Sequence, residues 1–206
     1  RDPEMSRGLG DVYKRQEYGV TVLTKSNLVL RDLDLLQSIN KKAKAVVQMT
    51  LTTYDEELCR KIEPHVSTTR ERFEVLMRCK ELGIPTLVWM TPILPFINDT
   101  RENIEGLLDY CLLAGVQGIL VFDVGVTLRE GDREYFYQAL DRDFPGIRQK
   151  YISTYGNAYD IPSPYAKELM ALIQNTCVAN GMLCSPKKCF TYLHEFPERY
   201  VQQTLF

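Results

Sequence analysis

An α/β fold with a parallel sheet of about four strands and a helical C-terminal tail is what this sequence predicts. Short apolar runs alternate with amphipathic stretches along the chain. The runs are almost continuously hydrophobic, as expected for strands that are buried on both faces. A strand–loop–helix order repeats, and right-handed crossovers turn that order into part of a β/α barrel or an open doubly wound sheet.

The first two strands are each followed by a helical pattern. Residues 20–23 are rich in β-branched side chains and predict the first strand. Apolar residues at helical spacing over 33–39 predict the helix that follows. The second strand is expected over residues 45–50. Asp55 then suits the N-cap of the next helix, because acidic residues fill the first turn behind it.

Two further helix–strand pairs complete the repeat. A helix over residues 69–82 precedes a strand over residues 86–90. A helix with apolar residues at helical spacing over 104–111 precedes the fourth strand, at residues 118–122. A glycine closes each of these helices, as is common at helix C-termini.

Composition limits the classes of protein to which the chain can belong. Its 206 residues are 45% hydrophobic, which suits one substantial domain with a packed core. With 25 basic and 27 acidic residues the net charge is −2, so nothing attracts the whole chain to nucleic acid. No apolar run is long enough to span a membrane. The six cysteines are scattered and no secretory signal is recognisable, which favours reduced thiols in a cytoplasmic protein.

Changes in character divide the chain into three parts. Residues 11–16 resemble the translation of a sequencing-adapter end, and we leave residues 1–16 out of the fold as adapter-derived or disordered. Residues 17–127 hold the strand–helix repeats. Residues 128–206 are expected to form a helical extension with a final amphipathic helix over 163–180. Its tyrosines either pack a terminal subdomain or stack on a base beside a pocket.

Ligands of parallel α/β proteins gather at the carboxyl ends of the strands. The segments at these ends are polar or rich in Pro and Gly, and they cover residues 24–26, 50–53, 91–99 and 123–125. Turn chemistry alone would explain one such segment. Four of them at the same edge predict a binding face.

An ordered series of motifs carries a resemblance to a known family. In chain order the motifs are Leu23-Thr24-Lys25-Ser26, Arg31-Asp32-Leu33-Asp34-Leu35-Leu36, Thr50-Leu51-Thr52-Thr53, Glu63-Pro64, Arg70 to Arg72, Gly83-Ile84-Pro85, and Pro92-Ile93-Leu94-Pro95 with Asn98-Asp99 close behind. The series resembles the spore photoproduct lyase-like branch of radical S-adenosylmethionine proteins, often labelled DNA repair photolyases. The similarity covers essentially everything after residue 16.

The resemblance implies a fold and an activity. Members of that family form a six-stranded partial barrel of the TIM type, so this chain would be an incomplete (β/α)6 barrel that holds the third to sixth strands. A three-cysteine motif binds a [4Fe–4S] cluster, at which S-adenosylmethionine is cleaved reductively to a 5′-deoxyadenosyl radical. The parent protein would be a radical lyase acting on DNA lesions or another substrate, with flavodoxin or ferredoxin as its reductant.

The cluster motif is the point at which this sequence departs from the family. No Cys-x3-Cys-x2-Cys occurs, since four residues separate Cys184 from Cys189 and Cys177 lies farther upstream. These three cysteines are either free thiols or ligands of an auxiliary cluster or metal. We expect that the cluster loop was lost with the native N-terminus, that no metal ligands remain, and that this chain alone is inactive.

The resemblance also implies which charged residues hold S-adenosylmethionine. Lys25, at the end of a strand, could pair with the methionine carboxylate, or it is an ordinary loop lysine in solvent. Arg70 or Arg72 could add a second cation, or either could only pair with a neighbouring glutamate. Asp99 is expected to cap the following helix rather than to bind a ligand.

Uncharged residues complete the implied site. The hydroxyls of Ser26, Thr50 and Thr52 could bind the ribose or the amino group, although threonine is also an ordinary strand residue. Pro92 and Pro95 would form a rigid wall against adenine. No catalytic residue or hydrogen-atom donor can be chosen from the sequence.

Two other classes of function compete with this hypothesis. One is an α/β hydrolase or lyase without a cluster, but neither His65 nor His194 lies at the end of a predicted strand. The other is a noncatalytic adaptor associated with DNA or the sliding clamp. The last five residues, Gln202-Gln203-Thr204-Leu205-Phe206, resemble a clamp-docking peptide, although short motifs also occur by chance.

Overall fold

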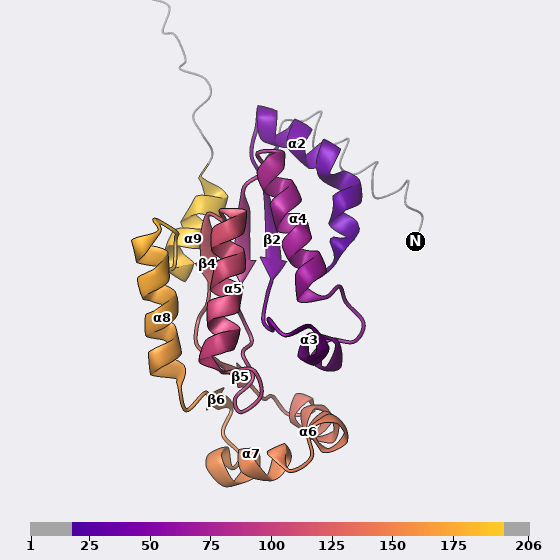
Figure 1. Cartoon of the computed structure of the whole chain (residues 1–206), viewed down its shortest axis with the longest axis vertical. Helices are drawn as coiled ribbons and strands as arrows, with labels where there is room; N and C mark the ends of the chain where they lie inside the picture. The colour runs from indigo at the N-terminus through magenta and orange to yellow at the C-terminus, as the bar shows by residue number, and fades with distance from the viewer. Residues whose placement is uncertain (1–17, 196–206) are drawn as a thin grey trace, which may run out of the picture.

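A computed structural model of the chain describes residues 18–195 and contains a parallel sheet of four strands. The strands lie side by side in chain order, and β2 and β4 are labelled in Figure 1. Their bounds are β1 (Val20–Thr24), β2 (Ala45–Thr50), β3 (Thr86–Trp89) and β4 (Gly118–Leu120). The predicted α/β class and the parallel sheet are therefore confirmed, with β3 and β4 slightly shorter than expected.

The crossover helices lie on one face of the sheet (Figure 1). They are α2 (Leu33–Lys42), α4 (Thr69–Glu81) and α5 (Arg101–Ala114), with α8 (Ala166–Ala179) packed beside α5. The short helices η1 (Asn27–Asp32) and α3 (Glu56–Ile62) precede α2 and α4. Alternate strand residues, such as Val47, Val88 and Ile119, enter the main core with these helices. Because side chains alternate across a strand, the neighbours of these residues point to the opposite face.

The opposite face of the sheet is covered at one end by α9 (Pro186–His194). Val46, Leu87 and Leu120 pack there against Cys189. Beyond α9 this face is open, since Leu23 is 54% exposed and Phe122 57% exposed. The sequence analysis missed α9 because it took the helix over 163–180 as the last one. The signal was a proline in the first helical turn, where its missing N–H costs nothing.

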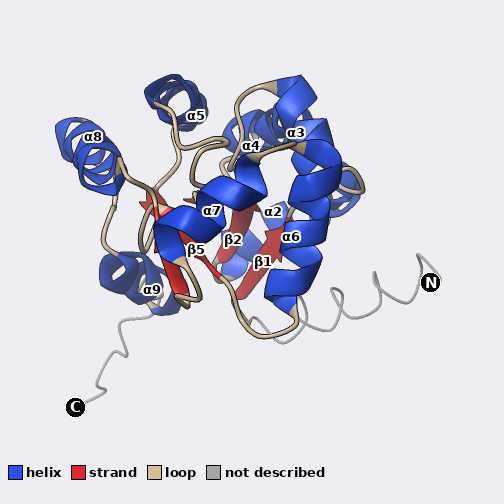
Figure 2. Cartoon of the chain, turned by 90° about the horizontal axis from the view of Figure 1, so that it is seen from below, coloured by secondary structure: helices blue, strands red, loops and turns tan. Residues whose placement is uncertain are grey.

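A two-helix excursion lies across the carboxyl edge of the sheet (Figures 1 and 2). It consists of α6 (Asp132–Asp143) and α7 (Ile147–Tyr155), between the short antiparallel strands β5 (Gly125–Thr127) and β6 (Asp160–Pro162). Tyr137, Leu140 and Tyr151 form a second core there with Leu128 and Ile161. These two tyrosines therefore pack a subdomain, as one of the two interpretations expected. The division after residue 127 stays a prediction, although β5 pairs with β6 across it.

Two predicted features fall outside the part of the chain that the structure describes. These are the adapter-like residues 1–16 and the clamp-like peptide Gln202 to Phe206. Within residues 18–195, no helix is both long and apolar enough to cross a membrane.

A close backbone contact protects the free edge of β4. The Leu183 N–H donates to the Gln117 carbonyl at 2.9 Å, and the Ile119 N–H donates to the Leu183 carbonyl at 2.7 Å. A Cβ on Gly118 would lie 2.5 Å from the Leu183 oxygen and 2.6 Å from the Leu183 Cβ. Only glycine therefore fits between β4 and this segment.

We predict that Gly118→Ala lowers the free energy of unfolding by about 2 kcal/mol, because neither backbone can move away without breaking the two hydrogen bonds. Urea denaturation measures the change. Gln117→Ala is the matched control, since Gln117 is exposed and contributes only backbone groups to this contact. Equal stability of the two variants would contradict the prediction.

Candidate functional site

A buried arginine ties together three segments at the carboxyl edge of the sheet. Arg72 is fully buried on α4, and its Nε donates to the Ser67 carbonyl at 2.7 Å. One terminal nitrogen donates to the Thr50 carbonyl at 3.0 Å, and the other to Glu63 Oε2 at 2.6 Å. The guanidinium thus has partners on the end of β2, on the end of α3 and on the turn before α4. Arg72 is too deeply buried to contact a ligand directly.

Local sequence explains why Arg72 reaches this position. Thr68 and Glu71 form a capping box, in which Thr68 Oγ1 accepts from the Glu71 N–H and Glu71 accepts from the Thr68 N–H. The first turn of α4 is held at the sheet edge by Thr69, whose hydroxyl donates to the Thr53 carbonyl. Arg72 follows one turn later on the same helix face.

Lys25 belongs to the same charge network. Its ammonium group pairs with Glu63 Oε1, while Arg72 holds Oε2 of the same carboxylate. The Lys25 side chain is 39% exposed and the Glu63 side chain 12% exposed. Two cations share one carboxylate, so one positive charge is in surplus, and only Lys25 presents it to solvent. Burial alone would raise the pKa of Glu63, but hydrogen bonds and charge from Lys25 and Arg72 lower it below the usual value.

The predicted hydroxyl residues have mainly structural contacts. Ser26 is the N-cap of η1, where its Oγ accepts from the Leu28 N–H at 3.2 Å. Thr50 and Thr52 are buried. The Thr52 carbonyl accepts from the side-chain amides of Asn98 at 3.0 Å and Asn103 at 2.9 Å. These residues set the positions of the loops around Lys25.

Asp99 has a different role from the predicted one. Thr100 is the N-cap of α5, because its side chain accepts from the Asn103 N–H at 3.1 Å. Asp99 is buried and accepts from the Ser163 hydroxyl at 2.5 Å, so it joins α5 to the segment before α8. The capping prediction was wrong because this long-range hydrogen bond competes for the Asp99 carboxylate. Burial raises the pKa of Asp99, although the bond from Ser163 opposes this.

A hollow of about 480 Å³ opens where β3 and β4 end. We call it the edge hollow, and its walls include Thr91, Pro92, Phe122 and Asp123. Phe122 and Asp123 are both exposed, so an aromatic face and a carboxylate are available to a ligand. Pro92 lines the edge hollow, and its role as a wall against adenine stays a prediction. Pro95 does not line the hollow, since it is buried and its carbonyl accepts from the Tyr151 hydroxyl of α7 at 2.7 Å.

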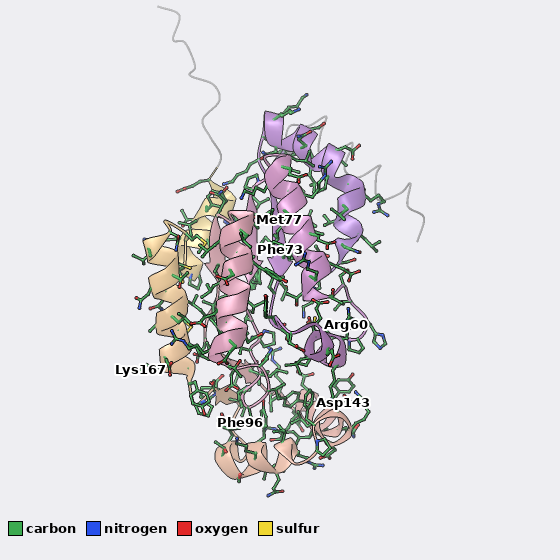
Figure 3. All side chains as sticks on the ribbon, in the orientation of Figure 1. Arg60, Phe73, Met77, Phe96, Asp143 and Lys167 are labelled. Atoms are coloured by element: carbon green, nitrogen blue, oxygen red, sulfur yellow. The ribbon has the colours of Figure 1, made fainter. Side chains whose placement is uncertain are left out.

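Phe96, the residue after Pro95, shows how the excursion is attached (Figure 3). Its ring meets the Tyr151 ring edge-on, with 5.5 Å between centroids, and Lys150 Nζ lies 4.1 Å from the Phe96 ring centroid. The loop that begins with Pro92 is thus packed against α7 through Phe96, near the end of the loop.

A polar chain on the open sheet face lies between the charge network and the edge hollow. Trp89 Nε1 donates to Gln48 Oε1 at 2.7 Å, and Gln48 Nε2 donates to Thr21 Oγ1 at 2.7 Å. The Trp89 and Phe122 rings are 6.1 Å apart between centroids. Gln48 and Trp89 therefore connect β1, β2 and β3 next to α9, whose Phe190 ring centroid lies 6.2 Å from that of Trp89.

The structure brings some predicted residues together and separates others. Lys25 and Arg72 meet at Glu63, and the Thr50 carbonyl accepts from Arg72. The sequence analysis named Glu63 only as part of the Glu63-Pro64 motif. Pro92 lies instead in the edge hollow. The available signal for Glu63 was its place directly before a helix-breaking proline, with basic residues on both sides in the sequence. The analysis also missed Phe122 and Asp123 as individual candidates.

Comparison with known proteins finds relatives that are described only as uncharacterized proteins, so their names indicate no activity. An uncharacterized protein of Mycobacterium tuberculosis is 29% identical over 150 residues, which are 73% of this chain and 44% of that protein. An uncharacterized protein of Acidianus two-tailed virus is 36% identical over 121 residues, 58% of this chain and 39% of its own length. One of Methanocaldococcus jannaschii is 33% identical over 102 residues, 49% of this chain and 38% of its own length. No family model and no solved structure matches the chain. The chain spans less than half the length of these curated relatives.

We predict that Glu63→Gln lowers the free energy of unfolding by about 3 kcal/mol at neutral pH, because it leaves a buried cation without its partner. The folded-state pKa of Glu63 lies below its unfolded value, so this stabilisation is present above pH 4.5. It is lost as the pH falls through the folded-state pKa. The stabilities of wild type and variant therefore converge in acid.

Urea denaturation at pH 7 and in acid measures this difference. Glu74→Gln is the matched control, because the Glu74 side chain is 63% exposed in its pair with Arg70 and should change stability little. A wild-type-to-variant difference that stayed constant with pH would contradict the role of the Glu63 charge.

Proposed function

We propose that this chain is the S-adenosylmethionine-facing part of a radical S-adenosylmethionine enzyme, with a partial β/α barrel like that of spore photoproduct lyase-like proteins. Strand order supports the barrel interpretation. A doubly wound sheet reverses its order at a switch point and carries helices on both faces. The four described parallel strands run in chain order, with every crossover helix on one face. The open face would then be the inside of the barrel.

The observation that carries the proposal is the pairing of a surplus cation with a nucleoside-sized hollow at one sheet edge. S-adenosylmethionine has a carboxylate at one end and a nucleoside at the other. Lys25 has an exposed ammonium group in a network of net positive charge, which suits the carboxylate. The edge hollow offers Phe122 for stacking on adenine and Asp123 to accept from ribose hydroxyls. The charge of Lys25 and the lining of the edge hollow therefore support the proposal.

The proposal gives several of the residues that the sequence analysis named a different role from the one expected. Lys25 and Pro92 keep direct roles, and Phe122 and Asp123 join them. Arg72 acts through Glu63 and so positions Lys25 rather than binding the ligand. Ser26, Thr50, Thr52 and Pro95 hold the surrounding loops in place through their own hydrogen bonds and packing.

The iron–sulfur cluster does not fit this chain. Among residues 18–195, no three His, Cys, Asp or Glu side chains form a group able to hold a metal ion. If the whole protein uses a cluster, other parts of it supply the ligands. For the whole protein we propose reductive cleavage of S-adenosylmethionine in the cytoplasm, with a DNA lesion as substrate and flavodoxin or ferredoxin as electron donor.

The competing functions have weaker support. A hydrolase or lyase that uses a histidine base would need that histidine at the edge hollow, where the acid–base groups are the carboxylates of Asp123 and Asp160. His65 is exposed in the turn after α3, and His194 lies at the end of α9 with its Nδ1 2.7 Å from the Phe190 carbonyl. Neither histidine lines the edge hollow. An adaptor function would depend on Gln202 to Phe206, which lie outside the described residues.

We predict that this chain binds S-adenosylhomocysteine, which keeps the carboxylate and the nucleoside, and that Lys25→Met weakens binding at least about tenfold through loss of a charge-assisted pair. Isothermal titration calorimetry gives the dissociation constants. Lys167→Met is the matched control, because Lys167 is an exposed lysine at the start of α8 (Figure 3) and does not line the edge hollow. Equal affinities for the two variants, or no binding by wild type, would reject the proposal.

We also predict that anaerobic reconstitution of this chain with iron and sulfide yields no stoichiometric [4Fe–4S] cluster, since the described thiols do not form a ligand set. Visible absorption and iron analysis of the desalted protein provide the measurement. A cluster bound at one equivalent would show that the ligand argument is wrong.

A further inference from the structure

Four of the six cysteines lie near one another where α5, α8 and α9 meet the edge of β4. Cys177 on α8 is fully buried in the main core with Cys111, Cys184 packs against this core, and Cys189 Sγ lies 3.8 Å from the carbonyl oxygen of Leu183, the residue before Cys184. Cys184, in the connection between α8 and α9, is only partly buried. No metal-holding group includes these thiols among the described residues. Any chemistry they perform is therefore that of thiols.

The chain path brings Cys177 and Cys184 together. After α8 the backbone reverses at Gly181, whose φ of +68° suits glycine, and the Met182 N–H donates to the Cys177 carbonyl at 2.9 Å. Leu183 then pairs with β4, which fixes the direction of the next residue. The partly buried Cys184 side chain packs against the main core, which contains Cys177.

Cys184 also has access to small molecules. It lines a hollow of about 520 Å³, which we call the thiol hollow. Phe122, Met182 and Lys188 line the thiol hollow as well. Cys59 and Cys79 are buried and lie apart from this group, so they serve as internal references.

The two thiols are chemically unequal. The hydrogen bond from Cys177 lowers the pKa of Cys184, although burial opposes this. The same bond, together with burial, raises the pKa of Cys177. Cys184 therefore deprotonates first, and it is also the thiol that faces the hollow. Cys177 is held as a neutral thiol next to it.

We propose that Cys184 is a site of reversible oxidation by peroxides, with Cys177 as the resolving thiol. The Cys184 thiolate attacks one oxygen of hydrogen peroxide, an S–O bond forms, the O–O bond breaks, and the hydroxide that leaves takes up a proton to give water. The Cys177 sulfur then attacks the sulfenic acid and loses its proton. An S–S bond forms, the S–O bond breaks and a second water leaves. Two thiols are oxidised by two electrons and one peroxide is reduced.

The disulfide would fix the turn that holds Leu183 against β4. Phe122 lines both the thiol hollow and the edge hollow, so the oxidised pair would adjoin the proposed ligand site. The oxidation itself rests on the thiols alone and does not depend on the proposed function.

Peroxide treatment, alkylation, trypsin digestion and mass spectrometry of the native chain test the proposal. Trypsin cuts after Lys167 and Lys187, so both thiols leave in one peptide. We expect this peptide to lose two hydrogens and both alkylation sites, and to recover both after dithiothreitol. Cys184 should react at least about tenfold faster than buried Cys79. If Cys184 stays alkylatable while Met182 gains oxygen, or if it reacts no faster than Cys79, the proposal is overturned.

Single substitutions separate the two roles. Cys177→Ser should accumulate a sulfenic acid at Cys184 that dimedone traps, with no disulfide. Cys184→Ser should leave Cys177 reduced. Cys79→Ser is the matched control and should behave as wild type. Equal dimedone labelling of wild type and Cys177→Ser would show that Cys177 does not react with the sulfenic acid of Cys184. If a variant fails to fold, the peptide measurement on wild type still tests whether the disulfide forms.

Discussion

The carboxyl edge of this sheet depends on how one buried guanidinium is satisfied. A fully buried cation is tolerated only when its donors have partners, and removal of one partner leaves an uncompensated charge. Arg72 meets this condition with two backbone carbonyls and one carboxylate, each from a different segment. The end of β2, the end of α3 and the start of α4 are therefore fixed relative to one another. Glu63 is held at one oxygen by Arg72, and its other oxygen determines where the Lys25 ammonium lies.

A second set of hydrogen bonds fixes the neighbouring loops. Asn98 accepts from the Leu94 N–H through its oxygen and donates to Thr52 and Thr53 through its nitrogen. Asn103 adds a donor to the same Thr52 carbonyl and another to the Asn98 carbonyl. The loop after β3 is thus fastened to the loop after β2 before any ligand arrives. Such preorganisation lets a binding site avoid the entropy cost of ordering its loops.

Local periodicity was enough to predict most of the fold, whereas the site required information that only tertiary structure contains. Strands and helices repeat their apolar pattern over a few residues, so the four parallel strands and the Asp55 cap were predictable. Glu63 pairs with Lys25 across 38 residues, and nothing local marks that pairing. Asp99 and Thr100 are both good capping residues, and the distant Ser163 decides between them. Lys25 and Arg72 were recognised as cations, but their different exposure, and hence their different roles, follows from packing alone.

Phe122 lies between the edge hollow and the thiol hollow and lines both. It lies two residues after the end of β4, whose residues pack on both sides of the sheet, yet its own ring is exposed and lines two hollows. A buried ring would stabilise β4 more, since an exposed aromatic side chain gives up most of its hydrophobic stabilisation. An exposed ring between two hollows is available to a partner that would cover it. In the proposed function that partner is the adenine of S-adenosylmethionine. Oxidation at Cys184 would then change the surroundings of the same ring within the thiol hollow. Cys184 directly follows Leu183, whose backbone pairs with β4.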